Sequence, residues 1–247
     1  MKRSAIPVET LHDVALFDGL AEHELRQVLQ AARERNLDDG AFFFMEEDLA
    51  ESIYVLIEGK VKLTQVTSDG QQVILGYLSP GREYGIIAMV PEQPYPVSAQ
   101  ATGESRALVW HQDRLMNLAE RFPRIALNAM EIMAGQIREF QNRVQELSTQ
   151  RVERRIARTI LRLARRSGRK IDQGILVDLP LSRQDIAEMT GTTLYTVSRV
   201  LSDWEDRGLV QSERQRVIIT YPHGLVSLAE DIPVGDVEPG EMDLSGF

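Results

Sequence analysis

The segment from Ser182 to Gly208 constrains the fold of this chain most strongly, because it predicts two helices joined by a tight turn. Ser182 and Asp185 have the spacing of a capping box, so the first helix should begin at Ser182. Gly191 stands where the backbone must turn sharply, and Thr193 is placed to cap a second helix that Gly208 can end. The spacing indicates two helices that cross closely, as in a DNA-binding helix-turn-helix.

The second helix has two different faces. One is an apolar stripe at steps of three and four residues that should point inward, formed by Val197, Val200, Leu201 and Trp204. The other carries hydrogen-bonding groups, namely Thr193, Tyr195, Thr196, Ser198 and Arg199. Arg199 can donate two hydrogen bonds to guanine, and Thr196 and Ser198 can reach a base edge or a phosphate. We predict that this face reads DNA; the alternative is a helical hairpin with an ordinary polar surface.

The net charge of the chain is −9, but the charge is unevenly distributed. Residues 151–222 contain 14 basic and 9 acidic residues, a net charge of +5, and they include the helix pair. Residues 223–247 contain 6 acidic residues and no basic ones, together with Pro and Gly, so we expect a disordered tail there. One basic segment around the helix pair is the asymmetry expected of a domain that binds double-stranded DNA.

Composition excludes several other kinds of protein. The chain has no cysteine, which rules out disulfides, thiolate nucleophiles and an iron–sulfur cluster held by cysteines. No segment approaches about 18 consecutive apolar residues, so we expect a cytoplasmic protein with no membrane partner. We find no Ser/His/Asp set, metal-ligand spacing or P-loop, and therefore expect neither an enzyme nor a metal site.

In the N-terminal half, the spacing of apolar residues changes from one typical of helices to one typical of strands. Residues 10–36 predict a helical preface, and residues 38–111 predict many short strands separated by Gly-containing turns, as in an antiparallel roll. A long helix follows from about Ile125 to Ser148, with a heptad-like seam formed by Met130, Met133, Ile137, Phe140, Val144 and Leu147. We predict that this seam pairs with a second copy of the chain; burial against the roll is the alternative.

Residues 151–222 continue as a basic amphipathic helix, a turn and strand, the helix pair and a strand hairpin. Arg214 and Arg216 lie at the hairpin turn, where they can reach the DNA backbone unless the tip is merely solvated. The predicted fold is therefore α+β, in four parts. These are an N-terminal helix and β-roll sensor domain (1–124), a dimerisation helix (125–150), a winged helix-turn-helix (151–222) and an acidic flexible tail (223–247).

Over about residues 11–222 the chain resembles the CRP/FNR family of bacterial transcription regulators. The resemblance lies in RRIARTILRLA and LSRQDIAEMTGTTLYTVSRVLSDWEDRGLV, and in the roll in IYVLIEGKVKL and LSPGREYG. It implies a homodimer on a palindromic DNA site and an action on RNA polymerase. It also places Ser182, Arg183 and Gln184 near phosphates or an outer base. The family's Glu in the second helix is Tyr195 here, so the half-site should keep the guanine read by Arg199 and differ beside it.

Two departures from the family pattern concern the signal. Members that bind cyclic AMP have a Glu after the Gly of the phosphate cassette and an Arg before its Ser. Here Ile86 follows Gly85, and Val97 precedes Ser98. A phosphodiester would lack its paired cation at this site, so cyclic AMP is not expected.

The effector site that we expect instead is an apolar cavity between the roll and the long helix. Its predicted lining is Tyr84, Ile86, Ile87, Met133, Ile137 and Phe140. Members that sense nitric oxide or carbon monoxide hold haem in this region, and TLYTVSR is most similar to the nitrogen-oxide-responsive group. Haem is therefore a candidate cofactor, although the histidines do not cluster as ligands (His12, His23, His111 and His223). Another small molecule, or no effector, also fits.

A function of another class would be a cyclic-nucleotide-type module that acts on a protein partner. It leaves the helix pair and the basic segment unexplained.

Overall fold

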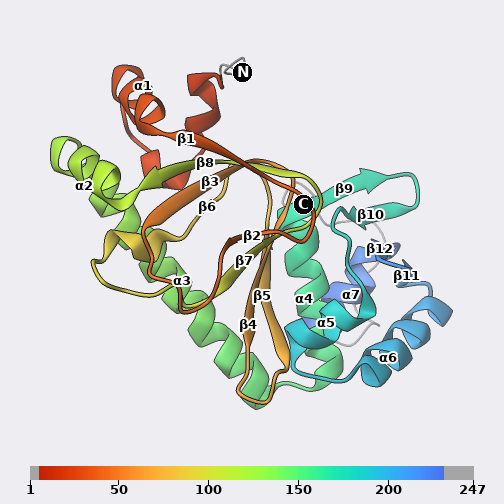
Figure 1. Cartoon of the computed structure of the whole chain (residues 1–247). Helices are drawn as coiled ribbons and strands as arrows, with labels where there is room; N and C mark the ends of the chain where they lie inside the picture. Colours follow the sequence, from red (N-terminus) through yellow and green to blue (C-terminus); the bar gives the residue numbers. More distant parts are fainter. Residues whose placement is uncertain (1–5, 231–247) are drawn as a thin grey trace. The chain divides into compact units, whose positions relative to one another are not determined.

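The computed structural model describes residues 6–230 and shows two compact units in an α+β fold (Figure 1). Of the described residues, 6–66 and 75–141 form the N-terminal unit, and 67–74 and 142–230 form the C-terminal unit. Each unit has its own sheets and its own buried core. The α+β class predicted from the sequence is confirmed.

The chain begins with short helical segments that cover one end of the N-terminal core. These are η1 (Val8–Leu11), η2 (Ala15–Phe17) and α1 (Glu22–Ala31). The prediction of helix through residue 36 was wrong for its last part, because Arg33–Leu37 forms strand β1. β1 pairs antiparallel with β8 (Ser105–His111), with Arg35 opposite Ala107. This pairing is a non-local contact that helical periodicity does not reveal.

The predicted roll is present as two four-stranded antiparallel sheets, ordered β1-β8-β3-β6 and β2-β7-β4-β5. Its remaining strands are β2 (Phe42–Phe44), β3 (Ser52–Glu58), β4 (Val61–Val66), β5 (Gln72–Leu78), β6 (Glu83–Tyr84) and β7 (Ser98–Ala101). The short helix η3 (Ile86–Met89) follows β6. The turn between β3 and β4 requires glycine at Gly59, where φ is 86° and a Cβ would lie 2.4 Å from the Glu104 carbonyl oxygen.

Two helices follow the roll, α2 (Gln112–Arg121) and α3 (Arg124–Thr149). The first turns of α3 belong to the N-terminal core. There the buried Asn128 donates hydrogen bonds to the carbonyls of Leu16 (3.0 Å) and Asp18 (2.9 Å). Farther along α3, large apolar side chains of the predicted seam are exposed, namely Met130, Ile137, Phe140, Val144 and Leu147. Met133 is partly buried against the core.

The C-terminal unit is the predicted winged helix-turn-helix. Its helices are α4 (Val152–Ser167), α5 (Arg183–Thr190), α6 (Leu194–Asp206) and α7 (Pro222–Glu230). Its strands are β9 (Gly168–Ile171), β10 (Gly174–Val177), β11 (Val210–Glu213) and β12 (Arg216–Ile219), in the sheet order β11-β12-β10-β9. The strand hairpin predicted around Arg214 and Arg216 is therefore β11 and β12.

The predicted tail needs one correction, because residues 223–230 belong to helix α7. Leu225 and Ala229 are buried, and the Ala229 carbonyl accepts hydrogen bonds from Arg154 (2.7 Å) and Arg158 (3.0 Å) of α4. This short apolar run is helical because it packs against α4, and composition alone does not predict that contact. The rest of the predicted tail, residues 231–247, lies outside the described residues.

None of the helices within residues 6–230 combines the length and the apolar composition needed to cross a membrane.

Candidate nucleic-acid interface

Helix α5 begins and ends as its sequence predicts. The Ser182 hydroxyl accepts a hydrogen bond from the Asp185 N–H at 3.0 Å, and the Asp185 carboxylate accepts one from the Ser182 N–H at 2.8 Å. The helix ends at Gly191, which is left-handed with φ 61°. Ala187 is buried in α5, which packs against α6. These local features fix the start of the helix pair.

Helix α6 begins at its predicted cap. The Thr193 hydroxyl accepts a hydrogen bond from the Thr196 N–H at 3.2 Å, and the two threonine hydroxyl oxygens lie 3.0 Å apart. The helix ends before Gly208, which is left-handed with φ 68°. Both threonine hydroxyls are thus engaged with each other at the first turn.

The two faces of α6 differ largely as predicted. Of the four residues expected to point inward, Val197, Leu201 and Trp204 are fully buried and Val200 is half-buried. On the opposite side Tyr195 is 75% exposed, Arg199 is exposed and Ser198 is half-buried. A face with hydrogen-bonding and aromatic groups is therefore available at the N-terminal half of α6.

Leu194, the first residue of α6, is 48% exposed and was not among the predicted DNA contacts. It stands three residues before Val197, so helical periodicity assigns it to the buried stripe. The structure instead leaves this leucine about half exposed.

The C-terminal half of α6 has a different electrostatic character. Asp203 and Asp206 are exposed there, and Asp203 pairs with Arg207 at 3.1 Å. Carboxylates repel DNA phosphates, so the end of α6 that begins at Leu194 is the end that suits DNA.

At the start of α5, Arg183 has partners inside the unit. Its guanidinium donates to the Ser212 hydroxyl at 2.9 Å and lies 3.7 Å from the Glu205 carboxylate. Gln184 is exposed and donates to Glu188 at 2.9 Å. These internal partners of Arg183 were not predicted, because Glu205 and Ser212 are distant from it in sequence.

The hairpin of β11 and β12 carries both predicted arginines near its turn. Gln215, between them, has a left-handed backbone with φ 61°. Arg214 is exposed, and Arg216 lies 3.8 Å from Glu213. The hairpin therefore presents two cations from adjacent turn and strand positions.

The roll interior contains a cluster of five aromatic side chains, namely Phe43, Phe44, Tyr54, Tyr84 and Tyr95. Phe44 and Tyr95 are stacked with ring centroids 3.7 Å apart, and Tyr54 stacks on Tyr84 at 5.2 Å. Arg35 borders the cluster and donates to the Phe43 carbonyl (2.8 Å) and to the Tyr54 hydroxyl (3.1 Å). This part of the roll interior is thus filled by aromatic rings that pack against one another.

The residues predicted to line an effector cavity have different environments. Tyr84 and Ile86 are buried, and Ile87 and Met133 pack at the edge of the core. Ile137 and Phe140 are 59% and 65% exposed. The structure therefore distributes the six side chains between the core and an exposed helix face.

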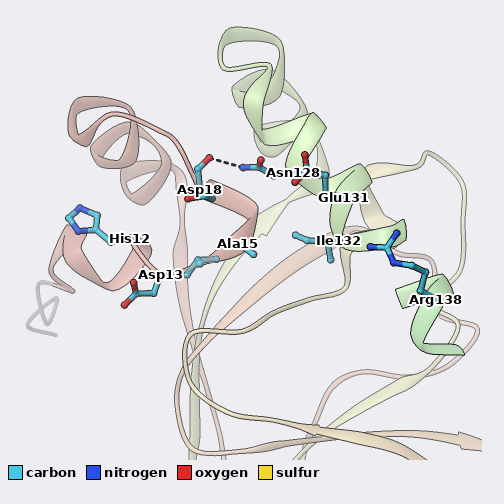
Figure 2. A pocket seen from close by; sticks show the side chains of 9 residues that line it. His12, Asp13, Ala15, Asp18, Asn128, Glu131, Ile132 and Arg138 are labelled. Carbon is cyan, nitrogen blue, oxygen red and sulfur yellow. Dashed lines mark hydrogen bonds between the residues drawn. The ribbon is translucent and has the colours of Figure 1, made fainter. Parts of the chain in front are cut away.

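A pocket of about 560 Å³ lies between the N-terminal segment and α3 (Figure 2). Its lining is His12, Asp13, Val14, Ala15, Asp18, Asn128, Glu131, Ile132 and Arg138. None of the six predicted effector residues is among them. Within the described residues, no group of three or more His, Asp or Glu side chains is placed to hold a metal ion. His12, His23 and His111 are exposed, and His223 is on α7.

Comparisons with known proteins identify both units. Residues 154–228 match the Crp-like helix-turn-helix domain, and residues 34–122 match the cyclic nucleotide-binding domain. The transcriptional activator protein FnrA of Stutzerimonas stutzeri is 30% identical over 197 residues, which cover 80% of each chain. This chain belongs to the CRP/FNR family of transcription regulators.

Other CRP/FNR proteins show the same relationship over most of the chain. The CRP-like cAMP-activated global transcriptional regulator of Mycobacterium tuberculosis is 26% identical over 212 residues, 86% of this chain and 95% of that protein. The structure of FixK2 from Bradyrhizobium japonicum is similar with a TM-score of 0.70 and 25% identity, over 80% of this chain and 96% of that one. The winged helix-turn-helix is thus a DNA-binding domain of a transcription regulator, and a module that acts only on a protein partner is not favoured.

The residues of this roll do not fit a cyclic nucleotide. Ile86 and Val97 stand where the family pattern has the charged contacts to ribose and phosphate, and Ile86 is buried. The Ser98 hydroxyl already accepts a hydrogen bond from the Glu46 N–H at 2.9 Å. The stacked rings of Phe44 and Tyr95 lie beside Gly85, where an added Cβ would be 3.5 and 3.3 Å from them. A phosphodiester placed here would meet apolar side chains without a paired cation.

Proposed function

We propose that this CRP/FNR regulator forms a homodimer that reads a palindromic promoter site, with the N-terminal half of α6 in the major groove of each half-site. The exposed face of that half carries the proposal, because Tyr195, Ser198 and Arg199 lie opposite the buried Val197. The Arg199 guanidinium matches the two acceptors of guanine. Tyr195 has no carboxylate to accept from cytosine, so the base preference beside the guanine should differ from that of Glu-containing relatives.

We assign the other predicted contacts mainly to the DNA backbone and the outer bases. They lie at the starts of α5 and α6 and on the hairpin, and they are Ser182, Arg183, Gln184, Thr193, Thr196, Arg214 and Arg216. Arg183 retains this role beside its internal partners, because a guanidinium has five N–H donors. Such contacts position the domain without reading sequence, so their loss should lower affinity evenly across DNA sequences.

The dimer is proposed to form through the exposed seam of α3. Met130, Ile137 and Phe140 are each more than half exposed, and Val144 and Leu147 extend the same seam. These side chains recur at heptad spacing, which suits pairing with the same helix of a second copy. Two copies would present two recognition helices to two half-sites about one DNA turn apart, about 34 Å.

The regulator is proposed to act on RNA polymerase at promoters in the cytoplasm and to catalyse no reaction. The names of relatives support activation, since FnrA is a transcriptional activator protein. We place its signal at the roll and the adjoining part of α3, around Tyr84, Ile86, Ile87, Met133, Ile137 and Phe140. Haem with nitric oxide, another small molecule, and regulation by expression alone remain the three alternatives. An absorption spectrum before and after addition of haem and nitric oxide separates the first from the others by its Soret band.

The test of DNA reading is selection of bound sequences from a random pool, followed by affinity measurements on the selected site. We expect Arg199→Ala to weaken binding to that site by about 1–3 kcal/mol, equivalent to about fivefold to 150-fold in Kd. Arg26→Ala, which removes an exposed arginine from α1, is the matched control and should bind normally. A variant without Arg199 that keeps its preference over random DNA would contradict the assignment.

The test of dimerisation is sedimentation together with site binding. Ile137→Glu places a charge on the seam and should abolish dimerisation and site binding together. Gln136→Glu adds the same charge at the neighbouring exposed position and should remain dimeric. Wild-type affinity in a stable Ile137→Glu monomer would contradict the proposed seam.

A further inference from the structure

The first two residues of α6 expose a leucine side chain and an aromatic ring, and no apolar contact has yet been assigned to either. Leu194 is 48% exposed and Tyr195 is 75% exposed, and we call them the Leu194–Tyr195 platform. They occupy the end of the helix that is proposed to enter the major groove. An isolated exposed leucine is ordinary, but this one immediately precedes an exposed tyrosine in the first turn of the helix proposed to read DNA.

The threonine hydroxyls next to the platform already form hydrogen bonds within the first turn of α6. Thr193 caps the helix by accepting from the Thr196 N–H, and the two hydroxyl oxygens are 3.0 Å apart. Ser198 and Arg199, one turn along, remain as the polar groups of this face. The first turn therefore presents the Leu194 side chain and the Tyr195 ring as apolar groups, with the tyrosine hydroxyl beside them.

The major groove offers one principal apolar feature to such a surface, the C5 methyl group of thymine. We propose that the Leu194–Tyr195 platform reads thymine methyl groups beside the guanine that Arg199 reads. Tyr195 lies four residues before Arg199, which places the two side chains about 6 Å apart along the helix. Bases rise about 3.4 Å per step, so the thymines should lie within about two base pairs of the guanine.

This inference rests on the proposed function and adds the chemical feature that sets half-site preference. It also explains how the helix reads DNA without the Glu of its relatives. An acidic side chain selects a base that donates a hydrogen bond, whereas leucine and an aromatic ring select a methyl group. Thymine should therefore replace the base that a carboxylate would prefer beside the guanine.

The experiment uses the full-length protein and the site selected from the random pool. Each thymine of the half-site is replaced in turn by deoxyuridine, which removes only the methyl group, in both half-sites together. Affinity is measured by fluorescence anisotropy at one salt concentration, because phosphate contacts make affinity depend on salt. We expect one or two positions at which deoxyuridine raises Kd by about fourfold to 15-fold, the range from loss of one buried methyl in the complex to loss of one in each half-site.

Variants assign the methyl contact to the platform. At one of these positions, the Leu194→Ala variant should bind DNA containing thymine and DNA containing deoxyuridine with equal Kd. Leu49→Ala removes a leucine of similar exposure, 57%, from the roll and should keep the wild-type response. Tyr195→Phe keeps the ring and should also keep its response to the methyl group, whereas Tyr195→Ala should lose it.

The outcomes separate this inference from the proposed function. A selected palindrome with no response to deoxyuridine at any thymine would overturn methyl reading and leave the regulator assignment intact. An unchanged response in Leu194→Ala and Tyr195→Ala would overturn the platform in the same way. Failure to select any site from the pool would instead count against the proposed function itself. Because both side chains are exposed, we expect all of these variants to fold, and thermal melting verifies it.

Discussion

The guanidinium of Arg183 lies 3.7 Å from the carboxylate of Glu205, and this pair joins the start of α5 to the last turns of α6. The same arginine donates a hydrogen bond to the Ser212 hydroxyl. The backbone N–H of Ser212 in turn donates to the Glu205 carboxylate at 2.8 Å. Three elements, α5, α6 and β11, are therefore linked around one carboxylate. The link fixes the recognition helix against the hairpin that follows it.

This network predicts a measurable coupling between its two charged groups. Arg183→Met and Glu205→Gln should each lower the free energy of unfolding of the C-terminal unit. Both side chains are about one-third exposed, so we expect a coupling energy of about 0.5–1 kcal/mol in a double-mutant cycle. Urea denaturation measures it. Additive effects of the two substitutions would show that the pair contributes nothing to stability.

The two glycines that bound α6 predict separable effects on stability and DNA binding. Gly191 and Gly208 have φ of 61° and 68°, so alanine at either position should cost about 1–2 kcal/mol. A Cβ at Gly191 would also lie 3.3 Å from the side chain of Leu147, whereas one at Gly208 would meet nothing within 4 Å. Thermal melting and anisotropy should show that Gly191→Ala is the more harmful for both. Equal losses would mean that the backbone conformation alone sets the cost.

The helix pair could be predicted closely because its signals are local. Ser182 and Asp185 form the capping box that their spacing indicates, and Gly191 has the left-handed conformation that the turn needs. The exposed face of α6 also follows from periodicity, since Val197, Leu201 and Trp204 define the buried side. A cap or a turn depends on residues within a few positions of one another, so it can be identified in a sequence.

Features that depend on distant partners could not be predicted in the same way. β1 has the sequence RERNL, without apolar alternation, and it is a strand because β8 pairs with it. The helix α7 depends on α4, and the partners of Arg183 lie more than 20 residues away in sequence. The aromatic cluster unites Phe44 with Tyr95 across 51 positions. Sequence alone gives the side chains that can pack but not the neighbours that they find.

The tyrosines of the roll predict opposite effects for the same chemical change. The Tyr95 hydroxyl accepts from the Ser52 N–H at 3.0 Å and donates to the Ser52 carbonyl at 2.6 Å. Tyr95→Phe should therefore cost about 1–3 kcal/mol, because it leaves two backbone groups without this partner. The buried Tyr84 hydroxyl bonds to no group within residues 6–230, so Tyr84→Phe should be neutral or stabilising. Equal melting temperatures for the two variants would refute this difference.

A buried carboxyl predicts how stability depends on pH. Glu83 is 8% exposed, and one of its carboxyl oxygens has no hydrogen-bond partner within the described residues. Burial raises the pKa of Glu83 above its ordinary value of 4.5, although backbone N–H groups of Glu83 and Ala15 and the charge of Arg82 partly oppose the shift. The folded protein therefore holds this proton more tightly than the unfolded chain does.

Because the folded pKa is the higher one, Glu83 contributes most to stability below its ordinary pKa. That contribution is lost as pH rises from 4.5 through the raised value. Glu83→Gln stays neutral and does not lose this contribution. The unfolding free energy of the variant minus that of the wild type should therefore increase as pH rises through this window. Glu104→Gln, at an exposed turn, is the matched control and should show no such gain. Denaturation curves across this pH range measure both differences. Parallel profiles for Glu83→Gln and the wild type would mean that the carboxyl ionises in the folded state as it does in water.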